Sequence, residues 1–294
     1  MGRRQPISGR IFSGFNYVFL ALFMLICLYP FYYVFIYSIS DPSLAQKGIT
    51  VLPAGFTLSN YIKVFSLQGI PNAALISVAR TVLGNLLTVM CSAFFAYLVT
   101  KEAMYFRKTI YRLVIITMYF GSGLIPVYLT YKMYHLLNNF LVYILPGMVG
   151  AFYVILLKTF IEQLPPALEE SAKLDGAGIF TIFFRLILPL SKPIIATVAV
   201  FAAVGQWNSW FDNYIYISPT FPQLNTLQLM LYNYLNQANA LAQQLDKTHI
   251  TVVRLTPQSV QMTITMIVTL PILFVYPFMQ RYFVKGIMLG AVKG

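Results

Sequence analysis

The length, composition and charge of this chain indicate a membrane protein. It has 294 residues, of which 59% are hydrophobic and 10% are charged, whereas about 25% of the residues of a typical soluble domain are charged. The net charge of +12 lies in short segments between apolar runs, which is typical of membrane topology and argues against a nucleic-acid partner. We therefore expect an all-α polytopic protein surrounded by membrane lipid.

Six apolar segments are long enough to cross a membrane, which takes about 20 residues. They cover, approximately, residues 13–39, 73–99, 111–130, 139–161, 193–216 and 259–283. Residues 1–12 form a basic tail before the first segment, and residues 13–294 are expected to form a single transmembrane domain. Two connecting segments stand out: 162–192, which carries both signs of charge, and the polar segment 218–257.

The distribution of Lys and Arg gives the expected orientation. With the N-terminus in the cytoplasm, fourteen of these residues lie on the cytoplasmic side and five on the outer side, as the positive-inside rule requires. Arg80, the last of the twenty, lies within the second apolar segment. We therefore expect both termini and the segment 162–192 in the cytoplasm, and the segment 218–257 outside.

The segment 162–192 reads as two short helices joined at a corner. Pro165–Pro166 suits the first turn of a helix, and Glu169–Glu170 lies near the positive end of that helix. Gly176 is expected to end it, and the apolar Ile179–Leu188 forms a second helix that stops at a proline. These residues alone fit either a solvated loop or a docking element for a cytoplasmic partner.

Several stretches of the chain resemble a known family. Glu170–Ala172, Asp175–Ala177 and Leu188–Pro189 resemble the EAA loop of ABC importer permeases, with Glu-Ser-Ala in place of Glu-Ala-Ala. "GQWNSWFDNYIYI", residues Gly205–Ile217, and the ending Leu270–Gly294 resemble the maltose-transporter type of carbohydrate permease. The resemblance extends over nearly the whole chain and is strongest to the branch that imports oligosaccharides or fragments of complex polysaccharides.

This resemblance implies a type I importer permease fold with six transmembrane helices, in the cell membrane of a bacterium. The chain would pair with a homologous permease as a heterodimer and would work with two ATP-binding subunits and an extracellular or periplasmic solute-binding protein. It would bind no cofactor, since ATP and Mg would be held by the partner ATPase subunits, and it would catalyse no reaction itself. The residues that the resemblance assigns to coupling with the ATPase are Glu169, Glu170, Ser171, Ala172, Asp175 and Gly176.

Candidate residues for a sugar path combine aromatic rings with amides, the groups that bind sugars. They are Trp207, Asn208, Trp210 and Asn213 in the fifth apolar segment, with Asn85 and Tyr119 in the second and third. At helical spacing, Trp207, Trp210 and Tyr214 would share one face. The alternative is that Tyr214 and Tyr216 belong to the aromatic belt at the membrane interface.

Two charges in the membrane lead to a further prediction. A charge within a span is costly and seldom faces lipid, and Arg80 and Asp212 lie at comparable depths from the outer side. We expect them to approach each other, or Arg80 to pair across the permease dimer. An ion-coupled secondary transporter is the alternative function, and Asp212 is the acid on which it would depend. The two histidines and two cysteines are far apart in the sequence, so we expect no metal site.

Overall fold

The chain forms two compact units of helices. The structure, a computed structural model, describes residues 7–48, 51–245 and 257–291. Unit 1 consists of Met1–Leu67 with Asn233–Thr269, and unit 2 of Gln68–Tyr232 with Leu270–Gly294. Helices α13 (Leu227–Leu245) and α14 (Pro257–Ala291) each contribute residues to both units.

Unit 1 contains the long helix α1 (Ile7–Ser38) and the short helices α2 (Pro42–Ala45) and α3 (Ser59–Ser66). The end of α1 is fixed by Asn60, which is buried and donates hydrogen bonds to the carbonyl oxygens of Ser38 (3.0 Å) and Ser40 (2.8 Å). These carbonyls have no partner within α1, so the amide of Asn60 takes the place of the missing helical donors.

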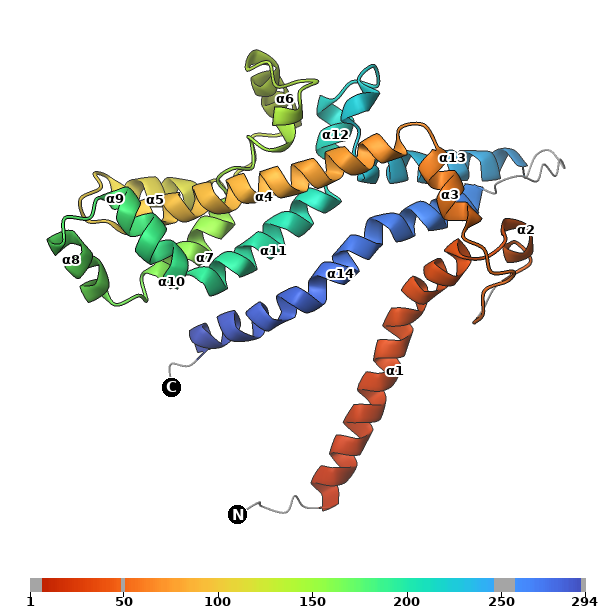
Figure 1. Cartoon of the computed structure of the whole chain (residues 1–294), viewed down its shortest axis with the longest axis horizontal. Coiled ribbons are helices and arrows are strands. Elements are labelled where there is room, and N and C mark those ends of the chain that lie inside the picture. Colours follow the sequence, from red (N-terminus) through yellow and green to blue (C-terminus); the bar gives the residue numbers. More distant parts are fainter. Residues whose placement is uncertain (1–6, 49–50, 246–256, 292–294) are drawn as a thin grey trace. The chain divides into compact units, whose positions relative to one another are not determined.

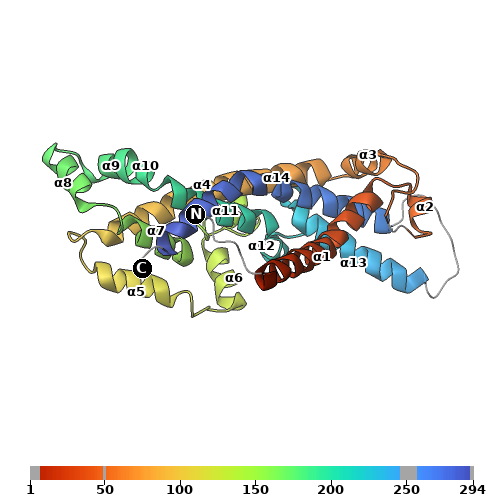
Figure 2. The same ribbon diagram turned by 90° about the horizontal axis from the view of Figure 1, so that it is seen from below.

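Unit 2 is built around the helix α4 (Ile70–Thr100). The further elements of this unit are α5 (Arg107–Ile116), α6 (Leu124–Met133), η1 (Phe140–Tyr143), α7 (Ala151–Ile161), α8 (Pro166–Leu174), α9 (Ile179–Ile182), η2 (Phe183–Ile187), α10 (Leu188–Leu190), α11 (Lys192–Asn208), α12 (Phe211–Tyr216) and η3 (Pro222–Leu224). α4 packs along α7 and α11, and the two views in Figures 1 and 2 place α8, α9 and α10 at one end of α4.

The core of unit 2 lies where α4, α7 and α11 meet. Ala93 and Ala96 are buried on α4, and their small side chains allow the neighbouring backbones to approach closely. Val154 and Leu157 of α7 and Val198 of α11 complete the packing and are inaccessible to solvent. This close packing makes α4 the element against which the other helices of unit 2 are positioned.

Among the described residues, three helices are long and apolar enough to cross a membrane. They are Phe12–Ser38, Ile70–Thr100 and Gln258–Val275. A fourth span results if Ile179–Leu190 and Lys192–Asn208, which meet at an angle of 84°, are taken as one bent pair. These segments coincide with four of the six predicted spans, and the full count of six stays a prediction.

The remaining two predicted spans, 111–130 and 139–161, are interrupted in the structure. In 111–130, α5 ends at Ile116 and α6 begins only at Leu124, after Gly123 has adopted a left-handed φ of 83°. In 139–161, only Ala151–Ile161 forms an α-helix. Counting apolar residues overlooked the glycines and prolines that break both segments.

Candidate functional site

The charged pair Arg80 and Asp212 is the centre of a polar cluster inside unit 2. Arg80 of α4 is 2% exposed, and its Nη2 lies 2.6 Å from Oδ2 of Asp212 on α12. Its Nη1 donates to the other carboxylate oxygen at 3.2 Å, which makes the pair bidentate. The sequence prediction that these two residues approach each other is therefore confirmed.

Every N–H of the Arg80 guanidinium has an acceptor. Besides the two bonds to Asp212, Nε and Nη2 donate to Oε1 of Gln206 at 3.3 and 3.2 Å, and Nη1 donates to the carbonyl oxygen of Ser209 at 3.2 Å. A guanidinium has five N–H donors, and these five bonds use all of them. The face of the ring of Tyr143 lies 4.5 Å from Cζ of Arg80, in a cation–π contact.

The bonds of Arg80 span a break in the helix formed by the fifth apolar segment. α11 ends at Asn208, Ser209 is extended (φ −73°, ψ 125°), and α12 begins at Phe211. A helix that breaks leaves carbonyl groups without a helical donor, and such groups are costly in a membrane. Arg80 satisfies the carbonyl of Ser209 and binds acceptors on both sides of the break, so it stabilises the angled arrangement of α11 and α12.

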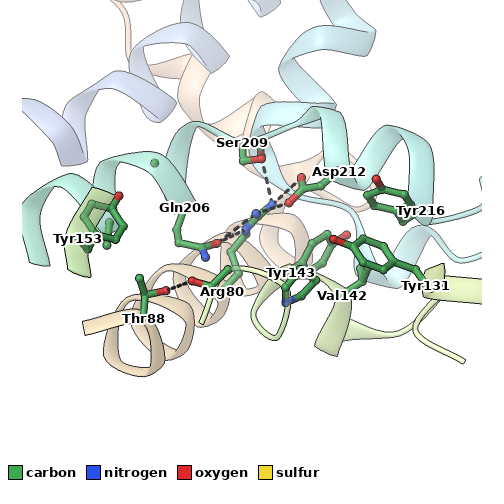
Figure 3. A pocket seen from close by; sticks show the side chains of 14 residues that line it. Arg80, Thr88, Tyr131, Val142, Tyr143, Tyr153, Gln206, Ser209, Asp212 and Tyr216 are labelled. Atoms are coloured by element: carbon green, nitrogen blue, oxygen red, sulfur yellow. Dashed lines mark hydrogen bonds and ion pairs between the residues drawn. The ribbon is translucent and has the colours of Figure 1, made fainter. Parts of the chain in front are cut away.

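A cavity of about 280 Å³ lies beside the cluster, close to the lower end of the size range of ligand pockets, roughly 300–1,000 Å³. Figure 3 shows Arg80 between Gln206 and Asp212, with Tyr131 and Tyr216 towards one end of the cavity and Tyr153 towards the other. The wall thus combines one neutralised ion pair with aromatic rings. Such surfaces offer ring faces and polar edges to a ligand.

The second polar region is the helix α8 and the turn that ends it. Gly176 has a left-handed φ of 79°, its N–H donates to the carbonyl of Lys173, and the N–H of Ala177 donates to the carbonyl of Ala172. These two bonds form a Schellman cap. The predicted start at Pro165–Pro166 and the predicted end at Gly176 are both confirmed.

The apolar helix after this corner differs from its prediction. It was expected to be a regular helix, Ile179–Leu188, ending at the following proline. Instead, the α-helical Ile179–Ile182 continues into a π-helical turn, Phe183–Ile187, and a last turn that ends at Leu190. Pro189 lies in this last turn and has no N–H to donate, which favours the wider backbone spacing just before it.

The acidic residues of α8 point in different directions. Glu169 has a side chain only 15% exposed and forms ion pairs with Lys101, just beyond the end of α4, and with Lys173, whose Nζ lies 3.1 Å away. Glu170 is exposed, as are Ser171, Asp175 and Gly176. One face of α8 is thus attached to unit 2, and the opposite face is open.

The electrostatic surroundings of this pair are asymmetric. Burial alone would raise the pKa of Glu169, but hydrogen bonds and charges from Lys101 and Lys173 lower it below its ordinary value. Burial lowers the pKa of Lys101, and the attraction of Glu169 opposes this only in part. Glu169 is therefore firmly ionised at neutral pH.

Comparison with known proteins extends over the whole chain. Protein LplC of Bacillus subtilis is 37% identical over 290 residues, which cover 98% of this chain and 96% of that protein. The polygalacturonan/rhamnogalacturonan transport system permease protein YtcP of Bacillus subtilis is 35% identical over 292 residues, which cover 98% of this chain and 100% of that protein. The chain belongs to the carbohydrate-type permease family of ABC importers.

The fold of this permease agrees with a solved member of the family. A chain in the crystal structure of a bacterial ABC transporter that imports the acidic polysaccharide alginate matches with a TM-score of 0.85 and 28% identity. The match covers 96% of this chain and 100% of that chain. No protein-family model matches the sequence. The permease is thus similar to sugar permeases in both sequence and structure.

The residues predicted for the sugar path lie outside the cavity. Trp207 lines a separate apolar cleft with residues of α4 and α14, whereas Trp210 stacks on Tyr232 with ring centroids 4.1 Å apart. The expected common face of Trp207, Trp210 and Tyr214 does not form, because α11 ends between the two tryptophans. Trp210 and Tyr214 still form an edge-to-face pair at 6.1 Å.

The asparagines and Tyr119 have varied surroundings. Asn213 is buried, and its Oδ1 accepts bonds from the N–H and the hydroxyl of Thr226. Asn208 accepts a bond from the Gln228 amide at 3.1 Å. Asn85 is half-buried, and Tyr119 is 80% exposed in the turn after α5. Their assignment to the sugar path stays a prediction.

Sequence reasoning identified Arg80 and Asp212 but missed several other residues that line the cavity. Gln206 and Tyr143 contact Arg80, and the Thr88 hydroxyl, also in the lining, donates to the carbonyl of Gly147 at 2.9 Å. Gln206 could have been found, because it is a polar residue in the same apolar segment as the acid that pairs with Arg80, six positions before it. Tyr143 carried no such signal among the 21 tyrosines of the chain.

Proposed function

We propose that this permease is the membrane-spanning subunit of a bacterial ATP-driven importer of oligosaccharides and forms half of the translocation path. The observation that carries the proposal is the whole-length match to sugar-system permeases, at 35% identity with 98% and 100% coverage for YtcP. Matches of this extent include the helical core and the α8 region alike. A permease of this kind moves its substrate without chemical change and is not itself an enzyme.

The proposed substrates are oligosaccharide fragments of polysaccharides. YtcP is named for polygalacturonan/rhamnogalacturonan transport, and the related solved transporter imports alginate, an acidic polysaccharide. The cavity beside Arg80 supports this class, because Tyr131, Tyr153 and Tyr216 line it. Aromatic rings pack against the apolar faces of sugar rings, and hydroxyls at their edges exchange hydrogen bonds with sugar hydroxyls.

The proposed assembly contains a second, homologous permease, two ATP-binding subunits that hold ATP and Mg, and an outer solute-binding protein. Six spans, with both termini in the cytoplasm, are part of this proposal. α8 would be the contact with the ATP-binding subunits. Its exposed residues support this role: Glu170 offers a charge to a basic partner, and Leu174 is an apolar side chain that is 89% exposed.

The ion-coupled alternative finds no support in the site. Coupling to an ion gradient normally uses a membrane-embedded carboxylate that gains and loses a proton or ion. Asp212, the candidate for this role, is held in a bidentate ion pair with Arg80. A carboxylate bound in this way has its charge already matched.

Copurification and transport by the membrane complex test the proposal. Wild-type permease is compared with Glu170→Ala, which removes the exposed acid of α8, and Gly176→Pro, which cannot adopt the left-handed φ of the cap. Glu102→Ala is the matched control, since Glu102 is an acid that is 91% exposed on a neighbouring loop. We expect the wild type and the control to recover an ATPase and a second permease and to transport oligosaccharide with ATP, and both α8 variants to lose ATPase recovery or coupling. A chain that purifies alone and transports on an ion gradient would refute the proposal.

A further inference from the structure

Glu169 of α8 points towards the rest of unit 2 and not into the surroundings. Glu169 and Lys101 form an ion pair in which the side chains are 15% and 18% exposed. The Nζ of Lys101 also lies 4.1 Å from the centroid of the buried Tyr97 ring, a cation–π contact that fixes the ammonium in place. α8 is thus tied to the last turn of α4.

A second contact joins the same two regions. Phe94 of α4 is stacked on Phe180 with ring centroids 5.3 Å apart and meets Phe183 edge-on at 5.1 Å. Phe183 is buried and also contacts Tyr97 at 5.6 Å. The helices on both sides of the Gly176 corner therefore hold α4, one through charge and the other through aromatic packing.

α4 connects this contact with the polar cluster. From Arg80 to its end at Thr100 the helix runs for about 30 Å, at about 1.5 Å per residue, and its one proline, Pro71, lies in its first turn. No proline interrupts the helix between Arg80 and Thr100. The helix therefore joins the α8 contact directly to Arg80, which binds both sides of the break between α11 and α12.

We propose that Glu169 is a positioning residue that transmits movement of α8 to α4 through its ion pair with Lys101, and that α4 passes this movement to the helix break held by Arg80. The proposal rests on the proposed function, and it assigns different tasks to two adjacent acids. Glu170, on the open face, meets the partner ATPase. Glu169, on the attached face, links α8 to the end of α4 within the permease.

The test separates docking from transmission. Glu169→Gln and Lys101→Gln each remove one charge of the pair with little change of shape, and the double variant Lys101→Glu/Glu169→Lys restores the pair with reversed charges. Lys173→Ala is the matched control, because this lysine also contacts Glu169 but is 58% exposed. Each complex is reconstituted in liposomes with its ATPase and binding protein. ATPase recovery, basal ATP hydrolysis and sugar transported per ATP hydrolysed are measured.

We expect both single variants to recover the ATPase and to hydrolyse ATP at the wild-type basal rate, with several-fold less sugar moved per ATP. The reversed pair is expected to regain most of the wild-type ratio, and Lys173→Ala to stay close to it. Thermal unfolding of each variant in detergent confirms that the single variants are folded.

Three results would overturn the inference. Normal transport per ATP in both single variants would show that the pair transmits nothing. Loss of ATPase recovery by Glu169→Gln alone would make Glu169 a docking residue. Failure of the reversed pair to recover, with both single variants impaired, would show that each side chain acts separately. Absence of any ATPase from the wild-type preparation would instead refute the proposed function.

Discussion

Replacing Arg80 by methionine removes five hydrogen bonds at once. Methionine has a similar length and adds no polar group, so the change leaves Asp212 without its cation and the carbonyl of Ser209 without its donor. Breaking a buried ion pair on one side costs about 3–5 kcal/mol, and an unsatisfied carbonyl costs about 1–3 kcal/mol. Asp212 is 24% exposed, so water relieves part of this loss, and we expect about 3–5 kcal/mol in total.

A double-mutant cycle attributes this loss to the pair. Asp212→Asn leaves the more deeply buried Arg80 with an unmatched charge, and we expect a destabilisation of similar size, about 3–5 kcal/mol. The double variant Arg80→Met/Asp212→Asn is expected to fall short of the sum by about 2–3 kcal/mol. Arg80→Lys should lie between wild type and Arg80→Met, since an ammonium keeps the charge but lacks the planar fork.

The assay is unfolding in mixed micelles by titration with SDS, followed by tryptophan fluorescence. The chain has two tryptophans, and both lie close to the break at Ser209. Trp210 follows Ser209 directly, and Trp207 is separated from it by one residue. The control is Lys108→Met, an exposed basic residue of α5, for which we expect a change within about 0.5 kcal/mol. If the effects at Arg80 and Asp212 add within about 0.5 kcal/mol, the ion pair does not hold the break and the reasoning fails.

Three further predictions concern the surroundings of these contacts. Gly84→Val places a side chain where its Cβ would lie 2.8 Å from the Gln206 amide. We expect a destabilisation of about 1–3 kcal/mol, measured by the same titration. No change would mean that the hydrogen bonds from Arg80 do not fix the position of Gln206. Phe183→Ala empties a site that is 1% exposed; we expect a loss of about 3–5 kcal/mol, and a loss below about 1 kcal/mol would show that the site collapses freely. The pKa of Glu169 is lowered in the folded protein, so its stabilising pairing is fully present above the ordinary carboxyl pKa of 4.5 and is lost as pH falls through the lower folded value. Limited proteolysis of α8 should therefore be slow at neutral pH and speed up only below pH 4.5, whereas the same rate at all pH values would contradict the pairing with Lys101.

The sequence was sufficient wherever local chemistry decides the structure. Pro165–Pro166 and Gly176 determine the ends of α8 through backbone geometry alone, and both were predicted. The pairing of Arg80 with Asp212 was also predictable, because a buried charge needs a counter-charge and few acids are available. These predictions depend on one or two residues and on a physical rule that tolerates few alternatives.

Other features depend on residues that are distant in the sequence. Glu169 and Glu170 look equivalent in the sequence, yet the packing of α8 on α4 gives them opposite surroundings. The same holds for Tyr143, whose contact with Arg80 is set by how η1 lies against α4. Such placements follow from tertiary packing and not from local pattern.

The complete use of the Arg80 donors has a consequence for an anionic cargo. Arg80 and Asp212 are the charged residues in the cavity wall, and they neutralise each other. If the proposed sugar path includes this cavity, a sugar acid within it would find the Arg80 charge already matched by Asp212 and every Arg80 donor already used. Its binding there would then depend on shape and on the aromatic and polar groups of the wall, and not on charge.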